Sequence, residues 1–365
     1  MTSPPSNPPL SIVVASRNDG HGGNLLRRMR TFLDGLLDQC RAYRVPAELV
    51  VVEWNPPPDR PGLCDVLPTP SADDWLTLRY IVVPGAIHRR YRRAPDLPMF
   101  QMIAKNVGIR RARGAFVLCT NVDLLFSDAL FRRLAGGALR ADTYYRANRC
   151  DVPDNLAPDG DLAERLAWCE RNVIRRIGRD PRCRHINLEA IGMQGRSNVK
   201  NRIVDTLALG LRPFWSREKL TFYRLDTFAC GDFTLMSQAA WTAIEGYVEL
   251  DLYSLHVDSL ALVAATALGY AQHVFPRDAC TYHIEHASGW EGLAPLEKVR
   301  FLERWPSIDY SLVPEIAFET LRRGKPFGLN APDWGYADVV LEEHTFAPGP
   351  ARAPRPAVDA VHAGA

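Results

Sequence analysis

Two polar residues interrupt an apolar stretch about a third of the way along the chain. Asn121 and Asp123 follow the apolar run 116–119, and the sequence then turns apolar again. Alternate side chains of a strand face the same side, so we expect the two to converge on one spot where a buried strand ends. Ligands bind at the carboxyl edge of open α/β sheets, which makes this spot a candidate site. A plain turn is the alternative, because Asn and Asp are good turn formers.

The elements needed to build such an edge alternate along the first part of the chain. Apolar runs predict strands over 10–16, 48–54 and 76–83. Apolar residues at helical spacing predict a helix over 24–43, and a helix over 98–113 precedes the strand that contains Asn121. This alternation predicts an α/β fold with a mostly parallel sheet and helices on both faces.

The pattern changes after residue 142. We expect a charged helix over 161–177, a strand over 226–236 that leads into a short helix over 238–244, and a helix over 259–268. Strands are expected over 271–275 and 281–286, the second of which closes the core. Two amphipathic pieces, 295–305 and 313–322, predict a C-terminal helical extension that packs back as a cap. The ends, 1–9 and 347–365, are Pro-rich and are expected to be disordered.

Composition limits the kinds of partner. The chain has 365 residues, 47% of them hydrophobic, and a formal net charge of only +2. Its one dense basic run, 88–93, is short and is expected to be a solvated loop, so no nucleic-acid partner is expected. No apolar stretch approaches the roughly 20 residues of a membrane span, which leaves contact with a membrane surface as an option. Eight cysteines without a CxxC pair, and no secretory leader, favour a reducing cytoplasm.

The order of seven short stretches along the chain is informative. They are SIVVASRND, ELVVVEWN, AKNVGIRRARG, TNVD, ACGDFTLMSQAAWTAIEGY, HVDSLALVAATALGY and TYHIEH. Their order and spacing over residues 10–290 resemble the GT-A nucleotide-sugar glycosyltransferases, particularly the large family 2. The chain departs from that family where it carries Asn121 in place of the first Asp of Asp-x-Asp, and where Glu53 replaces the usual Asp of the second strand.

The resemblance implies a GT-A (Rossmann-like) fold with a mixed, mostly parallel sheet. Residues 10–127 would form the half that binds the nucleotide-sugar, 128–290 the acceptor half, and 291–346 the helical cap. The donor would be a UDP- or GDP-sugar. The acceptor would be a glycan, a lipid-linked or a small-molecule hydroxyl, as in polysaccharide biosynthesis.

A divalent cation, Mn²⁺ or Mg²⁺, would stabilise the departing diphosphate. Asp123 is then the principal metal ligand, and neutral Asn121 binds a ribose hydroxyl or a metal-bound water. Either His283 or His286 could supply the metal ligand that is lost where Asn121 replaces an Asp. Their three-residue separation puts them on opposite faces of a strand, so at most one faces the cleft unless the chain bends. The resemblance favours His283, and a purely structural histidine is the alternative.

The nucleotide is expected over the ends of the first two strands. Ser16, Arg17, Asn18 and Asp19 end the first strand and open its loop, where glycines 20, 22 and 23 let backbone amides approach a ligand. Glu53 is expected to accept from a ribose hydroxyl or a base N–H.

In the helix over 98–113, Lys105 and Asn106 match the region where the family's Asn faces the nucleotide-sugar. Each of these assignments has an alternative. The loop after the first strand could be a flexible turn, Glu53 could be a surface acid, and Lys105 and Asn106 could lie on a plain helix surface.

Transfer also needs a base at the acceptor hydroxyl. Asp258 matches the family's catalytic acid, and direct displacement would invert the anomeric centre; a helix N-cap is its alternative role. Asp232 is the second catalytic candidate, and Trp290 could form a platform for a sugar ring. Two other functions remain open, a nucleotidyltransferase that makes the activated sugar and a non-catalytic binding module that retains the cleft.

Overall fold

The computed structural model describes residues 9–155, 160–178, 210, 212–286, 294–309 and 311–348. Its main sheet has the strand order β10-β6-β9-β4-β1-β2-β3-β12. The four strands β3, β2, β1 and β4 are parallel neighbours, whereas β9 and β12 run the other way. The predicted α/β fold with a mostly parallel sheet is therefore confirmed. The strands are β1 (Leu10–Ser16), β2 (Ala47–Trp54), β3 (Leu76–Val83), β4 (Phe116–Thr120), β6 (Thr143–Arg146), β9 (Phe233–Ser237), β10 (Ala271–Val274) and β12 (Glu342–Phe346).

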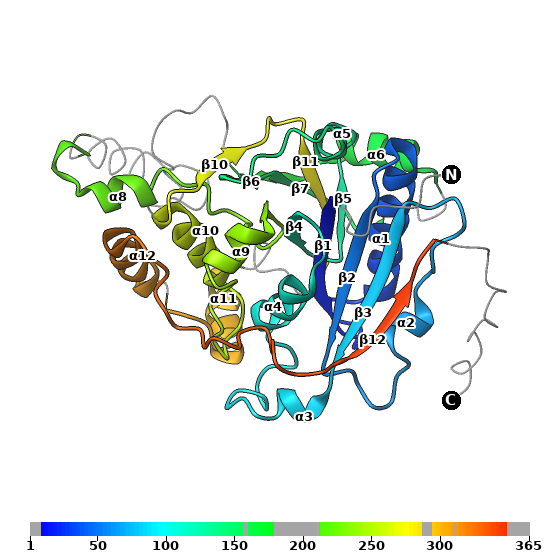
Figure 1. Cartoon of the computed structure of the whole chain (residues 1–365), viewed down its shortest axis with the longest axis horizontal. Helices are drawn as coiled ribbons and strands as arrows, with labels where there is room; N and C mark the ends of the chain where they lie inside the picture. Colours follow the sequence, from blue (N-terminus) through cyan, green and yellow to red (C-terminus); the bar gives the residue numbers. More distant parts are fainter. Residues whose placement is uncertain are drawn as a thin grey trace.

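Helices cover both faces of this sheet (Figure 1). Ile12 and Val14 of β1 pack on the side of α1 (Leu25–Tyr43) and α5 (Asp128–Ala135). Val13 and Ala15 pack on the side of α4 (Gln101–Arg111), α9 (Gln238–Ala243) and α10 (Val257–Ala267). Because both faces of each central strand are buried, its sequence is a continuous apolar run rather than an alternating one. The short helices α2 (Leu63–Val66) and α3 (Gly85–His88) follow β2 and β3.

A smaller sheet begins where β4 ends. Its order is β5-β11-β7-β8, and only β11 was predicted from the sequence. The helix expected over 161–177 ends early as α6, and its last residues form β8 instead. The two expected halves of the chain share the main sheet, where β9 lies between β4 and β6. The elements of this region are β5 (Leu124–Phe126), β7 (Asn148–Val152), α6 (Leu162–Arg171), β8 (Arg175–Ile177) and β11 (Cys280–Ile284).

The C-terminal segment contains more than the expected helices. The helices α11 (Pro295–Arg304) and α12 (Leu312–Arg323) form as predicted, and α12 packs on α10 and on α8 (Arg217–Phe222). However, the chain then passes to the far edge of the main sheet, where β12 pairs antiparallel with β3 (Figure 1). The expectation that 281–286 closes the core is therefore wrong. Trp290 and the ends 1–9 and 347–365, except residues 9, 347 and 348, lie outside the described residues.

A buried arginine explains why β12 docks there. Arg79 of β3 is 3% exposed and pairs with Glu48 of β2 at 2.9 Å and with Glu343 of β12 at 2.8 Å. It also donates to the carbonyl oxygen of Arg111 at 2.7 Å. Because a buried charge is costly unless it is paired, the edge strand and the arginine depend on each other.

The part of the chain that the structure describes contains no helix with the length and hydrophobicity of a membrane span.

We predict that Arg79→Ala lowers the free energy of unfolding by about 3–5 kcal/mol, because it leaves Glu48 buried without its cationic partner. Denaturant unfolding of the purified chain measures this. Arg140→Ala removes an exposed pair with Asp142 and serves as the control, which should change little. Equal effects of the two substitutions would contradict the assignment.

Candidate active site

Three potential metal ligands meet where the two sheets adjoin. The Ile284 amide of β11 donates to the Asp123 carbonyl at 3.0 Å, which fixes Asp123 beside that strand. Asp123 Oδ2 lies 3.2 Å from His286 Nε2 and 3.7 Å from His283 Nε2. One ligand atom from each residue lies within 4.8 Å of the others. The three side chains can therefore surround one cation.

Both His283 and His286 lie against Asp123 because β11 ends earlier than the expected strand over 281–286. β11 ends at Ile284, so His286 lies beyond it and is no longer bound by the alternation of a strand. The exception allowed for in the sequence analysis therefore applies, and both histidines lie against Asp123. His283 stays on the strand and is 6% exposed.

The charges of this cluster are mutually stabilised. Burial would raise the pKa of Asp123, but His283, His286 and Arg28 together hold it well below its usual value. Burial opposes the charged form of His283, yet Asp123 and Asp151 outweigh it and raise the pKa of its imidazole. In the absence of a cation, the histidine thus acts as the counter-charge of Asp123.

Asn121 does not share this spot. β4 ends at Thr120 and the chain bends, so the strand alternation assumed for residues 121 and 123 does not apply. The Asn121 amide oxygen accepts from Gln101 and Lys105, each at 2.9 Å, and its nitrogen donates to Asp232 Oδ1 at 2.5 Å. Asn121 therefore belongs to a second cluster.

The second cluster is built around buried Lys105. Its ammonium donates to Asn121 and, at 2.8 Å, to the Gly231 carbonyl, and burial lowers its pKa. Asp258 lies next to the same glycine, since a Cβ on Gly231 would come within 2.9 Å of Asp258 Oδ2. Asp258 is half-buried in the first turn of α10, whose N-cap is His256, so the alternative that Asp258 caps this helix is wrong.

Two residues that sequence reasoning missed join the clusters. Arg149 donates to Asp232 Oδ2 at 3.0 Å and to Asp151 Oδ1 at 2.5 Å, and that oxygen lies 3.2 Å from His283 Nδ1. Polar contacts thus lead from Asp123 to Asp232 and Lys105, and Lys105 binds the carbonyl of Gly231, beside which Asp258 lies. The signal in the sequence is the alternation Arg149-Cys150-Asp151-Val152, which is typical of a strand with one polar and one apolar face.

The residues expected at the nucleotide lie at the ends of β1 and β2. Asn18 donates to the Pro61 carbonyl at 3.0 Å, and Asp19 accepts from the His21 amide at 2.9 Å. Arg17 lies 3.6 Å from Asp19, while the Ser16 hydroxyl contacts the Met29 sulfur at 3.5 Å.

Glu53 holds the start of α2 with one carboxylate oxygen and leaves the other without a partner. Its Oε2 accepts from the Leu63 amide at 2.9 Å. Its Oε1 is buried and has no hydrogen-bond partner among the described residues. Burial raises its pKa. Such an oxygen suits a donor from a ligand.

Asn106 lies away from this region. Adjacent helical residues face different directions, so it cannot share the side of Lys105. Its amide nitrogen donates to the Tyr247 carbonyl at 2.8 Å and to Glu249 at 3.0 Å, and its oxygen accepts from the Tyr247 amide. The expectation that Asn106 faces a nucleotide-sugar is therefore wrong, because its polar atoms hold the turn after α9.

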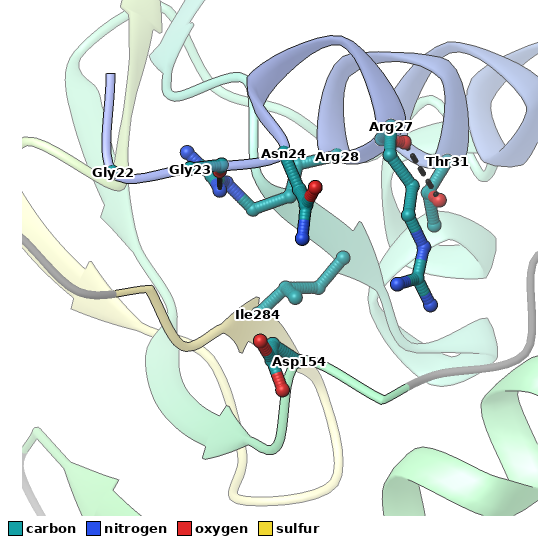
Figure 2. A pocket seen from close by; sticks show the side chains of 8 residues that line it. All are labelled: Gly22, Gly23, Asn24, Arg27, Arg28, Thr31, Asp154 and Ile284. Atoms are coloured by element: carbon teal, nitrogen blue, oxygen red, sulfur yellow. Dashed lines mark hydrogen bonds between the residues drawn. The ribbon is translucent and has the colours of Figure 1, made fainter. Parts of the chain in front are cut away.

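An open hollow is lined by Ile284, the neighbour of His283 in the chain, and by the start of α1 (Figure 2). Asn24 and Arg27 point into it from the start of α1, opposite Asp154 and Ile284. Arg28, also in its lining, donates to the carbonyls of Gly23 and His21. The first turn of α1 has no acidic residue and the Asn24 side chain makes no cap bond, so this end of the helix attracts anions.

Comparison with known proteins gives a distant structural likeness. No protein-family model matches the sequence, and no curated protein matches it. Among solved structures, the chain is similar to residues 1–349 of S. aureus TarS, a wall teichoic acid glycosyltransferase, with a TM-score of 0.40 and 13% identity over 86% of this chain and 71% of that one. A likeness this distant says nothing of a donor, a mechanism or a metal.

We predict that His283 contributes more to stability in mildly acidic than in alkaline solution. Its pKa is raised above 6.5, so its contribution is fully present below that pH and is lost as the pH rises through the raised pKa. The difference in unfolding free energy between the parent and His283→Gln, with chelator present, should be larger at about pH 6 than at about pH 9. A constant difference would contradict the ion pair.

Proposed function

We propose that this chain transfers a sugar from a UDP- or GDP-sugar to an acceptor hydroxyl, with a divalent cation at Asp123, His283 and His286. The observation that carries the proposal is the continuous polar network that joins these three side chains to Asp232, and through Lys105 to the neighbourhood of Asp258. A cation site and a carboxylate near the acceptor are the two groups that a metal-dependent, inverting glycosyl transfer uses.

The residues present fit a cation. Asp123 Oδ1 is buried and has no hydrogen-bond partner among the described residues, and the pKa of its carboxyl group is well below the usual value. One carboxylate and two imidazoles form a mixed oxygen and nitrogen donor set, which suits Mn²⁺ better than Mg²⁺ because Mg²⁺ prefers oxygen ligands. A cation bound here would offset the charge that develops on the diphosphate as the sugar leaves.

The donor nucleotide fits the ends of β1 and β2. The unpaired Glu53 Oε1 supports a hydrogen bond from a ribose hydroxyl or a base N–H. Arg27 and Arg28, together with the open N-terminus of α1, supply positive potential next to the cation site. They support our proposal that the diphosphate binds between β1 and β11.

The acceptor proton goes to Asp258 rather than Asp232. Both oxygens of Asp232 accept charge-assisted or amide hydrogen bonds, from Arg149 and Asn121, so its role is to bind and orient. Asp258 Oδ1 accepts from the amide of Ser259 at 3.0 Å, and its Oδ2 lies beside Gly231, where the absent side chain leaves clearance. Its carboxylate takes the proton as the acceptor oxygen attacks, and the anomeric centre inverts. A glycan, lipid-linked or small-molecule acceptor remains part of the proposal.

We predict that donor turnover requires the cation cluster. With a panel of UDP- and GDP-sugars, release of the nucleoside diphosphate should stop with chelator and return with Mn²⁺ more fully than with Mg²⁺. Asp123→Ala should cost at least about 10²-fold. Asp278→Ala, a change at an exposed carboxylate, is the control. Turnover that survives both chelator and Asp123→Ala would refute a cation-dependent reaction.

We also predict that Asp258→Asn lowers the rate of transfer at least about 10²-fold while nucleotide binding, followed by calorimetry, stays near the parent value. The amide keeps the shape of the side chain but cannot take a proton. Transfer at the parent rate would exclude Asp258 as the base. Metal-dependent nucleotide binding by the parent chain without transfer to any acceptor would favour a binding module instead.

A further inference from the structure

Asp151 stands directly behind one of the candidate metal ligands. In the parallel pairing of β7 with β11, Asp151 is the partner of His283, so the two side chains project from the same face of the small sheet. Asp151 is fully buried, and its Oδ1 lies 3.2 Å from His283 Nδ1. Among the described residues this buried nitrogen has no hydrogen bond of good geometry, and Asp151 Oδ1 is an acceptor within reach of its N–H. The other ring nitrogen, Nε2, is the one that lies toward Asp123.

Two arginines hold the Asp151 carboxylate in place. Its Oδ1 accepts from Arg149 Nε at 2.5 Å, and its Oδ2 accepts from Arg175 Nε at 2.6 Å. Arg149 is in turn tied to Asp232, and Arg175 to Glu285 at 3.2 Å. Two guanidinium groups on two strands thus fix one buried carboxylate against one imidazole.

We infer that Asp151 is a positioning residue that keeps the Nδ1 of His283 protonated and so presents Nε2 as the lone-pair donor to the cation. This rests on the cation site of the proposed function. A histidine ligand commonly donates its second N–H to a carboxylate, which fixes the tautomer and raises the basicity of the ligand nitrogen.

Calorimetric titration with Mn²⁺ tests the role through affinity. Asp151→Asn keeps the shape of the side chain and removes its charge, and it should weaken Mn²⁺ binding about 10–100-fold. Asp142→Asn, the same change at an exposed carboxylate paired with Arg140, should leave affinity unchanged. If Asp151 acts through His283, Asp151→Asn should cost nothing further in a His283→Ala background. An equal loss in both backgrounds would overturn the inference.

The tautomer can be read without any metal. In the metal-free parent chain labelled with ¹⁵N-histidine, NMR at a pH where the His283 ring is neutral should show the proton on Nδ1. A neutral ring with its proton on Nε2 would overturn the inference. A parent chain with the Nδ1 proton in place that binds no Mn²⁺ would instead refute the cation of the proposed function and leave the positioning role standing.

Discussion

The candidate active site depends on one backbone hydrogen bond, from the amide of Ile284 to the carbonyl of Asp123. The chain leaves the main sheet at Thr120. This hydrogen bond joins it to the end of β11, and the next residues pair with β11 as β5 of the small sheet. A carboxylate from the end of one sheet is thereby placed against histidines from the other. Neither sheet alone brings these groups together.

Buried charge explains the rigidity expected of this site. Each buried ionic group costs free energy unless partners of opposite charge and good geometry surround it, so a network of this kind tolerates few arrangements. Arg149 lies between two carboxylates, and Lys105 lies between an amide and a carbonyl. The same constraint operates at the opposite end of the strands, where Arg79 ties β12 to the sheet. Polar groups thus fix both the site and the edge that closes the fold.

Much of the framework could be predicted from local patterns. The strands β1 and β3 have the bounds that their apolar runs indicated, and α1 begins one residue later than expected. The short strands β5, β6, β7, β8 and β12 were missed. Each has five residues or fewer, and β7, β8 and β12 carry charged side chains whose partners come from other segments. Local hydrophobicity does not reveal a strand that is stabilised by ion pairs across the sheet.

The sequence by itself determined where the buried strands and amphipathic helices lie, because their periodicity records which side of each segment leaves water. It also supplied Asp123, Glu53, Asp258 and the two histidines as candidates. Only the tertiary structure decided that β11 stops before His286, that Asn106 turns toward Tyr247, and that Arg149 and Asp151 stand behind the cluster. These outcomes depend on contacts between segments that are distant along the chain. The hydrophobic periodicity of one segment does not reveal which distant segment it pairs with.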